Sequence, residues 1–176
     1  QAQAPIKIGI INSVTGPQAP IGETMANGYK LAVEDLAKKG IKLDLVVEDD
    51  TGKPQIALSG LEKLVTRDRV VGVVGAYTSA CSSAISKLAE RSKMPLVIPV
   101  SSKEEITKQG LKFVFRVSAT TEDYASVLLK LVQTLGKPRT MAILNENTDF
   151  GTSGAKAAKV IAGQKGIQIV AEEAYS

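Results

Sequence analysis

The chain has 176 residues, of which 44% are hydrophobic and 23% charged, the balance of a globular protein with a sizeable core. It contains no histidine, which excludes a serine–histidine–aspartate triad, a histidine-ligated zinc ion and a histidine general base. No apolar run approaches the roughly 20 residues that cross a bilayer as a helix. The only cysteine, Cys81, excludes an internal disulfide but not an oxidising compartment.

The net charge of +4 comes from 22 basic and 18 acidic residues that are scattered along the chain. Nucleic-acid-binding proteins usually gather basic side chains on one stripe with interleaved aromatic residues. Here aromatic residues make up 4% of the chain and tryptophan is absent. We therefore expect no nucleic-acid partner, no metal and no cofactor.

The first five residues, Gln1 to Pro5, are small and mostly polar and lead directly into an apolar segment. They lack the basic and apolar regions of a signal peptide. We expect them to be the remnant of a signal peptide that has been removed, which indicates export to the periplasm. A cloning remnant would look similar.

Apolar strands alternate with amphipathic helices along the rest of the chain. Strands are expected near residues 6–11, 43–47, 70–74, 95–99, 113–117, 141–144 and 167–171. Helices are expected near residues 22–39, 54–67, 79–92, 121–135 and 153–161, with one or two turns at 104–109. Nearly continuous apolar strands joined by helices indicate a parallel sheet that is covered on both faces. The predicted fold class is therefore α/β, with a doubly wound parallel sheet.

A weak repeat suggests a second lobe. The segment Ile10-Ile11-Asn12 leads through a helix to Lys39-Gly40-Ile41, and Ile143-Leu144-Asn145 leads through a helix to Lys165-Gly166-Ile167. We interpret residues 1–118 as an N-terminal lobe and 119–176 as the incomplete start of a second lobe. The alternative is that any two strand–helix–strand units look alike.

The common catalytic and nucleotide-binding motifs are missing. No glycine-rich dinucleotide fingerprint or Walker motif is present, and the segment from Gly75 to Cys81 is not a nucleophile elbow. Asn12 stands where a phospho-acceptor aspartate would end the first strand. The run Glu48-Asp49-Asp50 fits either a cation site or, more simply, a solvated strand end.

Small hydroxyl residues follow three of the predicted strands, where open α/β sheets bind their ligands. They are Ser13, Thr15, Thr78, Ser79, Ser101 and Ser102. Ser79 lies at the start of a predicted helix, so its hydroxyl and the N–H groups of Ala80 and Cys81 are placed to hold a carboxylate. The alternative is that Ser79 only caps its own helix. Cys81 is either a small buried residue or a reactive thiol.

With these residues the sequence resembles the periplasmic solute-binding proteins of the leucine/isoleucine/valine type, which have the type I fold and serve ABC importers. The resemblance covers the whole chain and rests on an ordered set of short motifs. They are Ile8-Gly9-Ile10, Ser13-Val14-Thr15-Gly16-Pro17, Gly22, Asn27-Gly28, Val74-Gly75, Thr78-Ser79, Pro99-Val100-Ser101-Ser102, Glu105-Ile106-Thr107, Phe115-Arg116 and Asp149-Phe150-Gly151.

The resemblance implies two lobes that close on an amino acid or similar molecule. It places the ligand carboxylate at Ser79 and Ser102 and an α-ammonium at the carbonyl of Val100. It has Tyr77 and Ile21 line the side-chain pocket, with Phe150 approaching from the second lobe. The family pattern often has threonine at the position of Ser102, and Cys81 lacks the disulfide partner that some members carry. Thr78 and Ser101 complete the expected site.

The expected function is capture of a small amino acid or related carboxylate in the periplasm, without chemistry, for delivery to the membrane subunits of an ABC permease. Because such proteins are about twice as long, we expect this chain to be the N-terminal portion of one. One alternative is a ligand-sensing receptor domain of the same fold. Another is an α/β enzyme that uses carboxylates such as Asp49 or Asp149.

Overall fold

The computed structural model describes residues 4–176, which form two compact units. The first unit comprises the chain up to Ser101 together with Ile106–Val117. The second comprises Ser102–Glu105 and Ser118–Ser176. Most of the expected export remnant, residues 1–3, lies outside the described residues. The assignment of residues 1–118 and 119–176 to two lobes of a hinged protein stays a prediction.

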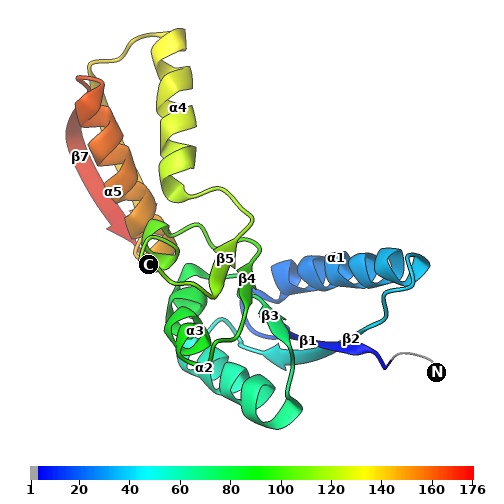
Figure 1. Ribbon diagram of the computed structural model, residues 1–176. Coiled ribbons are helices and arrows are strands. Elements are labelled where there is room, and N and C mark those ends of the chain that lie inside the picture. Colours follow the sequence, from blue (N-terminus) through cyan, green and yellow to red (C-terminus); the bar gives the residue numbers. More distant parts are fainter. Residues whose placement is uncertain (1–3) are drawn as a thin grey trace. The chain divides into compact units, whose positions relative to one another are not determined.

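The first unit is a doubly wound α/β unit, as the sequence predicts (Figure 1). Its elements are β1 (Ile6–Asn12), α1 (Ala19–Lys38), β2 (Leu43–Asp49), α2 (Pro54–Lys63), a π-helical turn (Leu64–Asp68), β3 (Gly72–Val74), α3 (Ser79–Arg91), β4 (Leu96–Ile98) and β5 (Val114–Arg116). All five strands are parallel, in the order β2-β1-β3-β4-β5. The chain winds from β1 to β2 on one side and then returns to β3 on the other. The sheet therefore has its switch point between β1 and β3.

The main core lies between this sheet and the helices α2 and α3, while α1 lies on the opposite face (Figure 1). Aliphatic side chains from both layers fill it with almost no exposed surface. They include Ile11, Leu61, Leu64, Val73, Ile85, Leu96 and Ile98. Burying each such side chain contributes about 1.5–3 kcal/mol, so this layer holds the strand ends in fixed positions.

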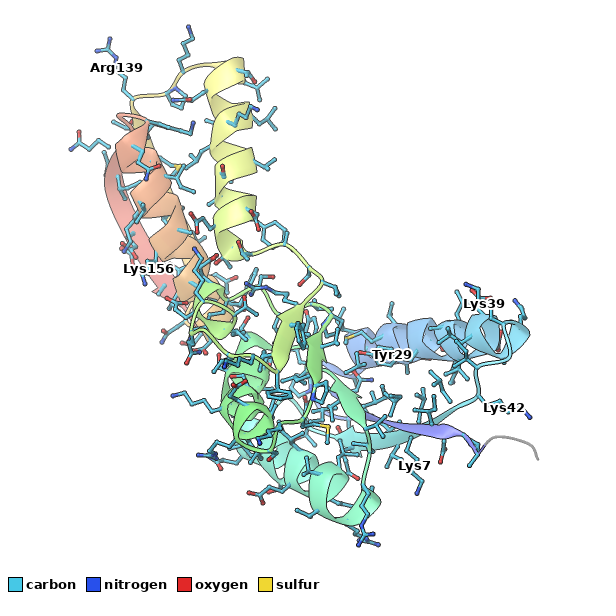
Figure 2. The ribbon with its side chains drawn as sticks, in the orientation of Figure 1. Lys7, Tyr29, Lys39, Lys42, Arg139 and Lys156 are labelled. Atoms are coloured by element: carbon cyan, nitrogen blue, oxygen red, sulfur yellow. The ribbon has the colours of Figure 1, made fainter. Side chains whose placement is uncertain are left out.

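Helix α1 begins at Ala19, three residues before the predicted start, with Pro20 in its first turn, where a missing N–H costs nothing. Its first turn rests on the end of β1: Asn12 Nδ2 donates to the Gly22 carbonyl at 2.8 Å. A Cβ on Gly22 would lie 1.9 Å from the Ser13 carbonyl oxygen, so only glycine fits there. Further along, Tyr29 lies on the side of α1 that faces the sheet, and burial raises its pKa to about 12 (Figure 2).

The second unit contains α4 (Thr121–Leu135), β6 (Thr140–Glu146), α5 (Asp149–Gln164) and β7 (Gln168–Tyr175), and the short 3₁₀ turn Glu104–Ile106 bridges its boundary with the first. The two strands are parallel, and α5 packs on them through a small core. That core comprises Ala125, Leu129, Ile161, Ala162 and Ile167.

Helix α5 begins four residues before the predicted start. Thr148 caps it, because the Thr148 hydroxyl oxygen accepts a hydrogen bond from the Gly151 N–H. A Cβ at Gly151 would lie 2.1 Å from the Glu146 carbonyl oxygen. This glycine, which weakens the helical pattern in the sequence, is therefore required by packing. None of the helices among residues 4–176 combines the length and the apolar character needed to cross a membrane.

Candidate functional site

The switch point between β1 and β3 brings two strand ends into very close approach. Gly75 follows β3 with a φ of +146°, and a Cβ there would lie 2.3 Å from the Ile11 carbonyl oxygen. Only glycine combines this backbone conformation with such an approach. The chain therefore leaves β3 directly beside the end of β1 and turns into helix α3.

Thr78, and not Ser79, caps helix α3. Thr78 has an extended backbone, and its hydroxyl oxygen accepts the Cys81 N–H at 3.2 Å. The alternative that Ser79 caps its own helix is therefore wrong, and the Cys81 N–H donates to the cap. Ser79 is the first helical residue and is 4% exposed. Its N–H and that of Ala80 belong to the first turn of α3, at the positive end of the helix dipole.

The loop from Ala76 to Thr78 is held by two buried serines. Ser101 Oγ lies 3.1, 2.9 and 3.0 Å from the carbonyl oxygens of residues 76, 77 and 78, in that order. It also lies 2.6 Å from Ser82 Oγ, which in turn accepts the Ala76 N–H at 3.1 Å. Sequence reasoning missed Ser82. The available signal was a serine at a position of α3 that faces the core, where a hydroxyl needs a partner.

The acidic run at the carboxyl end of β2 joins two loops. Asp49 accepts hydrogen bonds from the Thr15 hydroxyl and from the N–H groups of Val14, Thr15 and Thr51. Its partial burial acts to raise its pKa, but these hydrogen bonds outweigh that effect and hold the pKa below its ordinary value. Asp50, 1% exposed, accepts the Ser13 hydroxyl and the Gly52 N–H.

Asp50 therefore does not lie at a solvated strand end, and both carboxylates are engaged by the loops that they join. Within residues 4–176, no group of three or more acidic or cysteine side chains is arranged to hold a metal ion.

Cys81 fits the first of its two interpretations, a small buried residue. Its side chain is fully buried in the first turn of α3. Burial raises its pKa to about 11; the contact with Thr78 lowers the pKa, and the nearby Asp50 carboxylate raises it. A thiol in these surroundings is a poor nucleophile.

The remaining predicted residues divide between the two units. In the first unit, Val100 lies beside Ser101 after β4 and is 36% exposed, and Ile21 is an exposed residue of α1. Tyr77, Thr78, Ser79, Val100 and Ser101 thus gather near the carboxyl ends of β3 and β4. Three lysines lie near the amino ends of the strands instead: Lys7 in β1, and Lys39 and Lys42 between α1 and β2 (Figure 2).

In the second unit, Ser102 is 5% exposed and its carbonyl accepts the Thr121 N–H at 2.9 Å. Phe150 is 45% exposed in the first turn of α5. Its neighbour Asp149 forms an ion pair with Lys103 at 2.8 Å, which gives this carboxylate a structural partner.

The second unit also has a small cavity of about 150 Å³, which contains none of the predicted residues. It is lined by Glu104, Glu105, Glu122, Ser153, Lys156, Ala157, Val160 and Ile161. Lys156 of α5 (Figure 2) is engaged in an ion pair with Glu105 at 2.9 Å. The edge of the sheet at β1 and β3 is the stronger candidate site.

The chain belongs to the periplasmic binding protein family, whose model matches residues 5–176. A Leu/Ile/Val-binding protein of Rhizobium johnstonii is 33% identical over 99% of this chain and 48% of its own length. An ABC transporter substrate-binding protein from Sphaerobacter thermophilus superposes with a TM-score of 0.87 at 25% identity, over 98% of this chain and 48% of that one.

A third relative shares the fold with a different ligand. The solute-binding protein of an ABC transporter from Rhodopseudomonas palustris, solved with 3,4-dihydroxybenzoic acid, has a TM-score of 0.86 and 23% identity over 96% of this chain and 47% of its own. The chain thus spans about half the length of the relatives that it matches. All three are named as binding proteins, whereas Asp49 and Asp149, on which the enzyme alternative rests, are engaged in a hydrogen bond with Thr15 and an ion pair with Lys103.

Proposed function

We propose that this chain provides the carboxylate-binding part of an exported solute-binding protein that captures a small amino acid or a related acid. The observation that carries the proposal is the start of α3 at the switch point, where Thr78 caps the helix and Ser79 opens it. The relative named as a Leu/Ile/Val-binding protein supports branched-chain amino acids as the first ligands to test.

The proposed binding mode needs no chemistry. The ligand carboxylate accepts hydrogen bonds from the Ser79 hydroxyl and from N–H groups of the first turn of α3, where the helix dipole favours an anion. The Val100 carbonyl accepts from an α-ammonium, and Tyr77 and Ile21 contact the ligand side chain. Ser102 and Phe150 of the second unit stay predicted ligand contacts.

The cellular role belongs to the same proposal. We propose delivery to the membrane subunits of an ABC permease from a periplasmic location, which family membership and the transporter relatives support. We also propose that the two compact units are the N-terminal lobe and the opening part of a second lobe.

The first experiment is titration calorimetry of the full-length protein with L-leucine, L-isoleucine, L-valine and 3,4-dihydroxybenzoate, each beside its matched carboxamide. We expect at least one acid to bind, its amide to bind at least about tenfold more weakly, and the acid to be recovered unreacted. Equal affinity for an acid and its amide would contradict the proposal that the start of α3 binds the ligand carboxylate. The absence of binding by every acid, or recovery of a chemically altered one, would overturn the proposed function.

Transport and sensing are separated by measuring uptake. Deleting the gene should abolish high-affinity uptake of the radiolabelled acid that binds. Unchanged uptake, together with loss of a transcriptional or chemotactic response to that acid, would favour the receptor alternative.

A further inference from the structure

The position of Ser79 is set by the short loop Ala76–Thr78, which connects β3 to α3. Two buried hydroxyls hold this loop from the interior of the first unit. Ser101 is 2% exposed, Ser82 is fully buried, and their oxygen atoms are 2.6 Å apart. The two hydroxyls are engaged by each other and by the backbone groups of the loop.

Each of the two hydroxyls is within hydrogen-bond distance of the loop backbone as well as of the other hydroxyl. Ser101 Oγ lies 2.9–3.1 Å from three carbonyl oxygens. Ser82 Oγ accepts the Ala76 N–H and lies 3.3 Å from the Ala76 carbonyl oxygen. Either serine can therefore donate to the other, and in both arrangements the second hydroxyl proton reaches a carbonyl of the same loop.

The result is a relay that begins and ends on the same loop. It runs from the Ala76 N–H through the hydroxyls of Ser82 and Ser101 to the carbonyls of residues 76–78. The relay is anchored on both sides, because Ser82 belongs to α3 and the Ser101 carbonyl accepts a hydrogen bond from the Arg116 guanidinium at the end of β5. Buried hydrogen-bonded networks of this kind fix one backbone conformation.

We propose that Ser82 and Ser101 are positioning residues for ligand binding: their relay shapes the Ala76–Thr78 loop and thereby aims the Ser79 hydroxyl and the first-turn amides at the ligand carboxylate. This inference rests on the proposed function. It gives Ser101 a role beneath the site instead of a direct contact with the ligand, and it adds Ser82, which binds no ligand.

The test uses Ser82→Ala and Ser101→Ala, with Ser86→Ala as the matched control. Ser86 is equally buried one turn further along α3, but its hydroxyl donates to the Ser83 carbonyl within the same helix. For each full-length variant, the dissociation constants of L-isoleucine and L-isoleucinamide are measured, together with the free energy of unfolding, so that only folded protein is compared.

We expect Ser82→Ala and Ser101→Ala to weaken L-isoleucine binding about tenfold and to lower its advantage over the amide, since the carboxylate contact is misaligned. Ser86→Ala should lower the free energy of unfolding. It should change the acid-to-amide ratio, which is the affinity for L-isoleucine divided by the affinity for L-isoleucinamide, by less than about twofold. A ratio in Ser82→Ala and Ser101→Ala that equals the control would overturn the proposal. If the alanine variants fail to fold, Ser101→Cys keeps the size of the side chain with a weaker hydrogen-bonding group and must lower the ratio.

Amide hydrogen exchange of the unliganded protein separates this inference from the proposed function. Ser82→Ala and Ser101→Ala should speed exchange in residues 76–81 relative to Ser86→Ala, because the loop loses its fixed conformation. If exchange in residues 76–81 is the same in these variants as in Ser86→Ala, the relay is contradicted whatever the ligand data show. If exchange is faster but the protein binds none of the acids, the relay is supported and the proposed function is contradicted.

Discussion

The Ser13 hydroxyl donates to Asp50 Oδ1 at 2.6 Å in the interior of the first unit, so the loop after β1 is joined directly to the end of β2. Asp49, one residue earlier, holds the same loop from its exposed side through Val14 and Thr15. Two consecutive carboxylates therefore keep the strand ends beside the candidate site in register. Neither is arranged for acid–base chemistry.

The depressed pKa of Asp49 predicts a pH dependence of stability. Because its folded pKa lies below the ordinary 3.8, the ionised carboxylate stabilises the fold above about pH 4, and this contribution is lost as the pH falls through the folded value. Asp49→Asn should therefore lower stability at pH 7 and reduce the loss of stability between pH 5 and about pH 3. Denaturant unfolding at several pH values measures this.

Asp44→Asn is the matched control for this measurement, since Asp44 is an exposed carboxylate on the same strand. It should leave the pH profile close to that of the unmodified chain. A profile for Asp49→Asn that parallels the unmodified chain would show that the Asp49 hydrogen bonds contribute nothing.

Removing the Ser79 hydroxyl should weaken ligand binding. Ser79→Ala deletes one hydrogen bond to a buried, charged group, which costs about 1–3 kcal/mol of binding free energy. Calorimetry with L-isoleucine measures the change, and stability should hardly move because Thr78 supplies the helix cap. Unchanged affinity would mean that the carboxylate lies elsewhere.

Cys81 should be unreactive in the folded chain. With a pKa of about 11, only about a thousandth of the thiol is ionised at pH 8, and the sulfur is fully buried. Ellman's reagent should therefore detect no thiol in the native protein and one after denaturation. Rapid native labelling that is slowed by a bound acid would instead indicate an exposed, functional thiol.

The order of elements and the doubly wound sheet were predictable, because buried parallel strands are nearly continuous in apolar residues and helices repeat every 3.6 residues. The starts of α1 and α5 were predicted too late for different reasons. Helix α1 extends back through Pro20, which the predicted range omits although proline is tolerated in the first turn of a helix. Gly151 looks like a helix-breaking residue in the sequence, yet it lies where the Glu146 carbonyl oxygen leaves no room for a Cβ.

The site was only partly predictable. Thr78 and Ser79 are both good capping residues, and only the extended backbone at Thr78 decides between them. The pairing of Ser82 with Ser101 joins residues from α3 and from the segment after β4, which no local pattern reveals. The hydrogen bonds that link Ser82 and Ser101 to the Ala76–Thr78 loop can therefore be found only from the three-dimensional structure.

A crystal structure of the full-length protein with bound L-isoleucine tests the central claim most directly. The quantity to measure is the distance from the ligand carboxylate to Ser79 Oγ and to the first-turn nitrogen atoms of α3. We predict hydrogen-bond distances of about 2.7–3.2 Å to Ser79 Oγ and to at least one of these nitrogen atoms. A carboxylate more than about 4 Å from both, or bound away from the carboxyl ends of β1, β3 and β4, would contradict the account.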